Sequence, residues 1–323
     1  MGTGSQVLEK HIYTSPTPDA SVKEGGTEKP TTARVLRGRV AWRGRRIIVP
    51  PRLDKPEGKG EGVGGADVRS FLLGLACTRC GQFVDDGRAI RLECPACMHF
   101  LEARYDLVAA RGEIDRDTLF TNRGRSMWWL GPLLPVRSPG HIVSLMEGDT
   151  PLLPLQCWGA RRGLSRVLAK DETRNPTGSF KDRGASVTIS KCREVGIHSL
   201  VISSSGNASA AFSAYAAVGG RTLYALIRPH TSKVLAAQNC IYGARVARVR
   251  GTNREASRLA TELCRKNQWF DCATPRNLYR VEGKKTLAYE IAGQLGWTAP
   301  RWTICPTGGG TNALAVKWGT LLT

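Results

Sequence analysis

The sequence has no long apolar run. Its longest candidate, residues 127–136, has about half of the roughly 20 residues that a membrane-spanning helix requires. The first thirty residues carry several charges and lack the apolar centre of a secretory signal peptide. We therefore expect a protein that does not span a membrane, has no membrane partner and acts in the cytoplasm.

Aromatic residues are scarce, at 7% of the 323 residues. The formal charge of +20 is high, but it is spread along the chain, with +5 on residues 1–69 and +15 on residues 70–323. The densest basic cluster, residues 34–46, contains one aromatic residue, Trp42, which is little material for stacking nucleic-acid bases. The pattern favours a solvated arginine-rich surface over a nucleic-acid site.

Cysteine is plentiful, with ten residues, but a long chain without an export signal is unlike a small disulfide scaffold. Four cysteines form two C-x-x-C pairs separated by thirteen residues: Cys77, Cys80, Cys94 and Cys97. A two-residue gap lets both thiolates of a pair face one tetrahedral ion, so the spacing predicts a structural Zn²⁺ in a zinc ribbon. A redox dithiol is the alternative. His99 lies nearby, but four thiolates already complete the shell.

The composition divides the chain into four parts. Residues 1–69 are rich in Gly, Pro, Thr, Lys and Arg without apolar periodicity, which predicts a flexible basic tail in which only "RVLRGRVAWRGRRIIV" has strand character. Residues 70–110 are the predicted ribbon, with "RAIRLEC" as a short strand, and residues 111–146 are a linker. From residue 147 to 323, strand-like runs such as "SLVISSS" alternate with helical stretches, which predicts an α/β fold with parallel strands.

A turn-rich segment, "NPTGSFKDRG", leads into the amphipathic stretch "ASVTISKCREVG". It places Lys181 on the first turn of a helix, where the helix dipole disfavours a cation. The neutral amine, the form that attacks an aldehyde, therefore becomes more accessible. A lysine in this setting is more often an ordinary surface residue, so this signal needs support from elsewhere in the chain.

Two further loops follow predicted strands and precede predicted helices. "SSSGNAS" after "SLVI" brings small residues, which let the backbone approach a planar ligand, and the amide of Asn207, which can donate to a ring oxygen. An ordinary capped turn is the alternative. "TGGGTN" after the expected strand "RWTICP" offers free backbone N–H groups at a helix start, which suit a phosphate.

A lysine able to form a Schiff base, an amide for a ring hydroxyl and a glycine cradle for a phosphate together match the needs of pyridoxal 5'-phosphate. The motifs "NPTGSFKDRG", "SSSGNASAA" and "PTGGGTN", in this order, resemble the fold-type II pyridoxal-phosphate enzymes. With "SLMEGDTPLLPL", "YRVEGKKTLAYEIAGQLGW" and a ribbon in front, residues 70–323 are similar to the ribbon-bearing threonine synthases.

The resemblance implies two parallel α/β subdomains, a small one at about residues 175–272 and a large one at about 147–174 plus 273–323. It implies that Lys181 binds the cofactor and then moves protons, and that the product is threonine, formed from O-phosphohomoserine and water. The other residues that it assigns are, for the cofactor, Phe180, Asn207, Gly308, Gly309, Gly310, Thr311 and Asn312, and, for the substrate, Ser204, Ser205, Ser209, Arg280 and Lys285.

The family continues beyond the glycine cradle and supplies a late Ser or Thr to the pyridine nitrogen, so we expect the large subdomain to be incomplete at Thr323 and to expose apolar surface. The resemblance also implies a homodimer for the full-length protein. Two other functions compete with this one. A dehydratase-like β-eliminating lyase would share Lys181 and Asn207, and a ribbon-based nucleic-acid-binding module would show strongly salt-dependent binding.

Overall fold

The computed structural model describes residues 70–85, 92–121, 123–124, 126–273 and 277–322, together with four short strands between residues 12 and 46. Most of the predicted tail, and the greater part of "RAIRLEC", lie outside the described residues. The chain divides into two compact units: residues 16–64, and residues 1–15 with 65–323. In the first unit, β2 (Val35–Leu36), β3 (Arg39–Trp42) and β4 (Arg45–Arg46) form a three-stranded antiparallel sheet.

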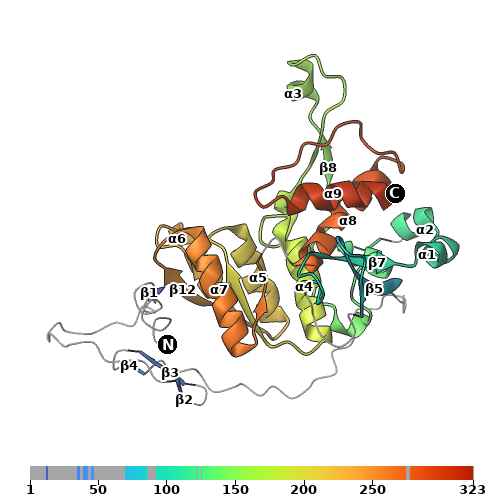
Figure 1. Cartoon of the computed structure of the whole chain (residues 1–323). Helices are drawn as coiled ribbons and strands as arrows, with labels where there is room; N and C mark the ends of the chain where they lie inside the picture. Colours follow the sequence, from blue (N-terminus) through green and yellow to red (C-terminus); the bar gives the residue numbers. More distant parts are fainter. Residues whose placement is uncertain are drawn as a thin grey trace. The chain divides into compact units, whose positions relative to one another are not determined.

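A five-stranded sheet organises the second unit, in the order β1-β12-β11-β10-β13 (Figure 1). The short β1 (Ile12–Tyr13) pairs antiparallel with β12, and the other strands are parallel. Their bounds are β10 (Ser199–Ser203), β11 (Thr222–Ile227), β12 (Arg245–Val249) and β13 (Phe270–Asp271). The predicted parallel α/β fold is therefore confirmed. The chain moves outward from β10 to β12 and then returns to β13 on the other side of β10.

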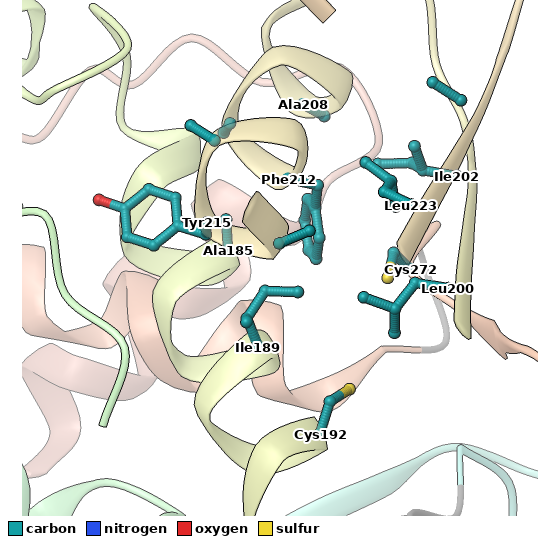
Figure 2. Close-up of a cluster of buried hydrophobic side chains, with 14 of the residues drawn as sticks. Ala185, Ile189, Cys192, Leu200, Ile202, Ala208, Phe212, Tyr215, Leu223 and Cys272 are labelled. Carbon is teal, nitrogen blue, oxygen red and sulfur yellow. The ribbon is translucent and has the colours of Figure 1, made fainter. Parts of the chain in front are cut away.

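Helices cover both faces of this sheet, because successive side chains of a strand point to opposite faces. Leu200 and Ile202 of β10 pack against α4 and α5, through side chains such as Ile189 and Phe212 (Figure 2). Val201, between them, packs on the opposite face against α7. The helices are α4 (Lys181–Glu194), α5 (Asn207–Val218), α6 (Lys233–Ile241) and α7 (Asn253–Asn267).

The remaining elements of this unit lie before and after the sheet in the sequence. The antiparallel pair β8 (Leu152–Pro154) and β9 (Leu168–Lys170) is joined through α3 (Gln156–Ala160). The long helix α8 (Leu278–Gln294) packs between α4 and α9 (Thr311–Leu322). The segment ahead of β8 contains α1 (Leu107–Glu113), α2 (Arg116–Thr121) and the 3-10 helices η1 (Met127–Leu133) and η2 (Pro139–His141), while η3 (Glu172–Arg174) follows β9.

Two glycines bring α4 and α8 into backbone contact. A Cβ on Gly283 would overlap the carbonyl oxygen of Arg183, and one on Gly184 would lie 2.9 Å from the carbonyl oxygen of Arg280. Cβ atoms are almost never found this close to a backbone oxygen. The approach sets the N-terminus of α4, which carries Lys181, beside the first two turns of α8.

A buried ionic network ties the same helices to β9. The guanidinium of Arg183, which is fully buried, donates to Glu172 and to Glu290, with its shortest contact at 2.6 Å from Nη1 to Glu290 Oε1. Lys170 Nζ approaches the other oxygen of Glu290 at 2.8 Å. Burial alone would raise the pKa of Glu290, but Arg183 and Lys170 lower it to about 2. Both carboxylates are therefore ionised, and the buried charges are paired.

One expected strand is absent. The run "RWTICP" was predicted to be a strand before the glycine loop, but residues 301–306 form neither strand nor helix. No described strand pairs with this segment, and an extended segment without a pairing partner has no sheet to join. Its apolar side chains are accordingly left exposed, with Trp302 at 82% and Ile304 at 97%.

Among the described residues, no helix is long and apolar enough to cross a membrane.

Candidate functional site

The four predicted metal ligands come together in one cluster. All their sulfur atoms lie within 4.8 Å of one another, and Cys77 Sγ and Cys97 Sγ are 3.4 Å apart. Sulfurs bound to a tetrahedral zinc at about 2.3 Å are separated by about 3.8 Å, so the spacing fits such an ion. His99 is outside this cluster, and its Nδ1 contacts Thr78 Oγ1 at 3.0 Å.

Backbone geometry explains the convergence of these thiols. Each pair is followed by a residue in the left-handed region, Gly81 with φ +74° and Met98 with φ +57°, which turns the chain back after the second cysteine. Backbone N–H groups of Cys80 and Arg79 then point at Cys77 Sγ, and they lower the pKa of Cys77 to about 6 in spite of its burial. The thiolate is the form that binds metal.

The ribbon is built on an antiparallel sheet of β6 (Phe83–Val84), β5 (Leu72–Cys77) and β7 (Leu101–Tyr105). Its buried side chains, including Leu75 and Leu101, share one core with Met127, Leu134 and Leu278 of the following region. The ribbon is thus packed on the part of the chain that also contains Lys181.

Lys181 is the first residue of α4, as predicted. The loop before it is pinned from both ends. Asn175 Oδ1 accepts from the backbone N–H of Gly148 at 3.0 Å, and Asp182 accepts from the backbone N–H of Thr177 at 2.7 Å. Gly178, with φ +77°, makes the turn between them. Because the loop is fixed on both sides, the position of the lysine is set by the fold rather than by its own side-chain contacts.

The amine of Lys181 lies over the ring of Phe180, 3.8 Å from the ring centre. Partial burial, followed by the positive charge of Arg280, lowers the pKa of Lys181 to about 8. The sequence argument attributed the destabilised ammonium to the helix dipole, whereas the structure adds burial and a neighbouring guanidinium. A substantial share of this amine is neutral near physiological pH, as attack on an aldehyde requires.

The glycine loop, residues 308–310, leads directly into α9. Gly310 has φ +78°, which favours glycine, and a Cβ added at Gly308 or Gly310 would meet no protein atom within 4 Å. The buried side-chain oxygen of Asn312 has no hydrogen-bond partner among the described residues. Open space at the Cβ positions of glycines that lead into a helix, beside a buried polar atom without a described partner, fits a bound phosphate-bearing group.

Three basic side chains of α8 differ in their surroundings. Arg280, 4% exposed, donates from Nη1 to the carbonyl oxygen of Cys272 at 2.7 Å. Lys284 donates from Nζ to Thr311 Oγ1 at 2.6 Å and lies 5.7 Å from the centre of the Phe180 ring. Lys285 pairs with Glu282 at 2.6 Å, and Glu282 in turn accepts from Tyr105 of the ribbon. Lys284, rather than Lys285, therefore adjoins Lys181.

Sequence reasoning selected Arg280 and Lys285 and missed Lys284. A signal was present in the helical period, because residues four apart lie on one face of a helix, whereas residues five apart do not. The spacing from Arg280 to Lys284 therefore predicts a shared face, and the spacing to Lys285 predicts a different one.

A cavity of ≈ 380 Å³ opens where the parallel strands end. It is lined by Arg280 from α8 and by residues at or just after the carboxyl ends of all four parallel strands: Ser203 at the end of β10, Ser204, Ser205 and Gly206 after it, Arg228 after β11, Asn253 after β12 and Ala273 after β13. Open α/β sheets bind ligands at this edge, where the chain reverses its direction across the sheet. The structure therefore brings Ser204, Ser205 and Arg280 into one hollow.

The other predicted residues are placed nearby with different exposure. Asn207 is the first residue of α5 and is exposed. Ser209 is fully buried, and its hydroxyl donates to the carbonyl oxygen of Gly206 at 2.9 Å, so it supports the loop. Phe180 and Asn312 line a second and larger cavity of ≈ 920 Å³ between the β8–β9 region and residues 298–306.

Comparison with known proteins gives the family of this chain. Residues 143–321 match the family model described as pyridoxal-phosphate dependent enzyme. The chain is 34% identical over 245 residues to a threonine synthase of Methanocaldococcus jannaschii and 35% identical over 249 residues to one of Methanosarcina acetivorans. These alignments cover 75% and 76% of this chain but 59% of each relative, so the chain spans about three-fifths of their length.

Among solved structures, diaminopropionate ammonia lyase from Escherichia coli matches with a TM-score of 0.50 at 18% identity, covering 55% of this chain and 53% of that one, which is a likeness of fold. The family model covers more than half of this chain, including Lys181 and the glycine loop. The chain belongs to the family of pyridoxal-phosphate dependent enzymes.

Proposed function

We propose that this chain performs the threonine synthase reaction, the conversion of O-phosphohomoserine and water to threonine and phosphate with pyridoxal 5'-phosphate as cofactor. The relatives that match three-quarters of the chain carry that name. The proposal includes action in the cytoplasm and assembly into a homodimer.

The observation that carries the proposal is the position of Arg280. Its guanidinium is buried at the wall of the cavity that Ser204 and Ser205 line, and it lies close enough to Lys181 to lower the pKa of that amine. Among the described residues it makes one hydrogen bond, to the carbonyl oxygen of Cys272, and no ion pair. A guanidinium has five N–H donors in a planar arrangement that suits phosphate, so the remaining donors can hold a phosphorylated substrate.

The cofactor is proposed to be held from three sides. Lys181 provides the amine, the amide of Asn207 donates to the ring hydroxyl, and the backbone N–H groups of residues 308–311 contact the phosphate. When bound, the pyridoxal ring withdraws the electron pair released at the substrate Cα. Lys181 would be placed to take the proton from Cα and to return protons to the substrate carbons, while Arg280 would orient the phosphate that leaves.

Replacing Arg280 by methionine tests the substrate assignment. Removing the guanidinium with little loss of volume is expected to raise the KM for O-phosphohomoserine about 10- to 100-fold, because a charge-assisted contact with phosphate contributes about 1.5–3 kcal/mol. The dissociation constant of the cofactor, followed by its visible absorbance, is expected to stay within about twofold. Steady-state kinetics of Arg258→Met, an exposed arginine of α7, provide the control. An unchanged KM in Arg280→Met would contradict the assignment.

The same assay separates the competing lyase. A threonine synthase consumes O-phosphohomoserine and releases inorganic phosphate, whereas a dehydratase consumes plain threonine or serine and releases ammonia. Greater turnover of the unphosphorylated amino acids would favour the dehydratase.

We further propose that the four-cysteine cluster holds a structural Zn²⁺. Four thiolates leave no open position for a reacting water, so the ion is expected to organise the ribbon rather than to catalyse. Elemental analysis of protein expressed with ample metal is expected to find about one zinc per chain, and Cys80→Ser is expected to lose most of it. Cys240→Ser, an exposed cysteine outside the cluster, is the matched control. Metal-free wild-type protein would refute the site.

A further inference from the structure

Lys284 is buried without a counter-ion among the residues that the structure describes. Its side chain belongs to the most buried part of α8, at 1% exposure, and its single described hydrogen bond runs from Nζ to Thr311 Oγ1 at 2.6 Å. Thr311 directly follows the three glycines and begins α9. The amine therefore sits between the glycine loop and the ring of Phe180, on which Lys181 also lies.

The other buried lysines, unlike Lys284, are each paired with a carboxylate. Each has a carboxylate within ion-pair distance: Lys170 approaches Glu290 at 2.8 Å, Lys191 approaches Glu194 at 2.6 Å, and Lys285 approaches Glu282 at 2.6 Å. Within the described part of the chain, no carboxylate pairs with Lys284. The adjacent basic groups, Arg280 and Lys181, add to the positive charge instead of balancing it.

This arrangement is costly in the absence of an anion. Burial, and then the charges of Arg280 and Lys181, lower the pKa of Lys284 to about 6. Near pH 7 the amine is therefore mostly neutral, and its charged form gains an ionic partner only when an anion enters. Because the nearest polar partner belongs to the start of α9, the anion that fits is one that the backbone N–H groups of this helix start also bind.

We propose that Lys284 is a phosphate-binding residue of this site, whose amine contacts a phosphate monoester bound beside the glycine loop. The inference rests on the proposed function, because that function supplies the two candidate phosphate groups. These are the 5'-phosphate of the cofactor and the phosphate of the substrate. Because Lys284 contacts Thr311, it lies at the side of the site that residues 308–311 form. Arg280 instead lines the cavity where the parallel strands end.

The test compares Lys284→Met with Lys233→Met. Lys233 is an exposed lysine at the start of α6, so its replacement removes the same charge from the surface. Titration of the purified full chain, followed by absorbance, measures the dissociation constants of pyridoxal 5'-phosphate and of pyridoxal, which lacks the phosphate. Calorimetry measures the binding of inorganic phosphate to the cofactor-loaded protein.

If Lys284 contacts the phosphate of the cofactor, Lys284→Met weakens pyridoxal 5'-phosphate about 10- to 100-fold and changes pyridoxal by less than about twofold. If it contacts the phosphate of the substrate, the cofactor affinity is kept and inorganic phosphate binds about 10- to 100-fold more weakly. Either result supports the inference. Affinities that match those of Lys233→Met, or equal weakening of pyridoxal and its phosphate, overturn it.

Folding is controlled by a second variant. Removing an amine that has no counter-ion is expected to leave the thermal midpoint unchanged or higher, and Lys284→Gln keeps a donor toward Thr311. Unfolding of both variants would show that the lysine is structural and would also overturn the inference. A wild type that binds phosphate through Lys284 but does not convert O-phosphohomoserine would refute the proposed function alone.

Discussion

Replacing Lys181 by alanine is expected to abolish the visible absorbance of the bound cofactor and to lower turnover by about 10³-fold or more. The amine is held at the first residue of α4 by a loop that Asn175 and Asp182 pin at either end. Its pKa of about 8 leaves roughly a tenth of it neutral at pH 7, against about one part in three thousand for an amine with a pKa of 10.5. The amine also contacts the ring of Phe180 and lies near Arg280.

The measurement is a spectrum of reconstituted protein, followed by borohydride reduction and mass spectrometry to locate the modified lysine. Lys233→Ala serves as the control, because Lys233 is exposed and distant in sequence from every motif of the site. A band retained in Lys181→Ala would refute the assignment. Lys284 would then be the first residue to examine, since it lies on the same aromatic ring.

Replacing Gly283 by alanine is expected to destabilise the protein by about 2–3 kcal/mol, by forcing α4 and α8 apart. The new methyl group would overlap the carbonyl oxygen of Arg183, and a backbone atom cannot rotate away as a side chain can. Separation of the helices would also disturb Arg183, which bridges Glu172 and Glu290. Since Lys181 begins α4 and Lys284 follows Gly283 on α8, cofactor affinity should fall as well.

Urea unfolding measures the change in stability, and Gly112→Ala is the matched control. Gly112 is an exposed helical glycine in α1 with no atom within 4 Å of its added Cβ, so alanine there should be neutral or stabilise by about 0.5–1 kcal/mol. Equal effects of the two substitutions would mean that the helix contact does not limit stability.

Local sequence patterns predicted much of this fold. The run "NREASRLATELCRKN" coincides with α7, and the strand-like runs before it match β10, β11 and β12 within one or two residues, apart from their polar tails. These elements can be recognised in the sequence because each has a local hydrophobic period. Helix α7 also begins with a capping box between Thr252 and Glu255. The strand expected in "RWTICP" did not form. Composition indicates strand character, but a strand also needs a neighbouring strand to pair with, and that partner is not encoded locally.

The candidate site residues also divide into those that the sequence identifies and those that only the structure reveals. Spacing along the chain was enough to identify four converging cysteines, since a C-x-x-C pair is local and two pairs make one tetrahedral shell. It was also enough to place Lys181 at a helix start and three glycines before another helix. Lys284 was not selected, because its proposed role depends on which carboxylates are absent around it, and only packing between α8, α9 and the Phe180 loop reveals that absence among the described residues.

The amino-acid sequence by itself therefore determined which motifs are present and which helices and strands carry them. Hydrophobic periodicity, turn chemistry and ligand spacing each depend on residues only a few positions apart. The folded arrangement alone decided how these motifs meet. Glycine contacts between α4 and α8, the burial of Arg280 and Lys284 without an ion pair among the described residues, and the shared edge of four parallel strands all depend on residues about 30 to 100 positions apart, whose approach no local pattern encodes.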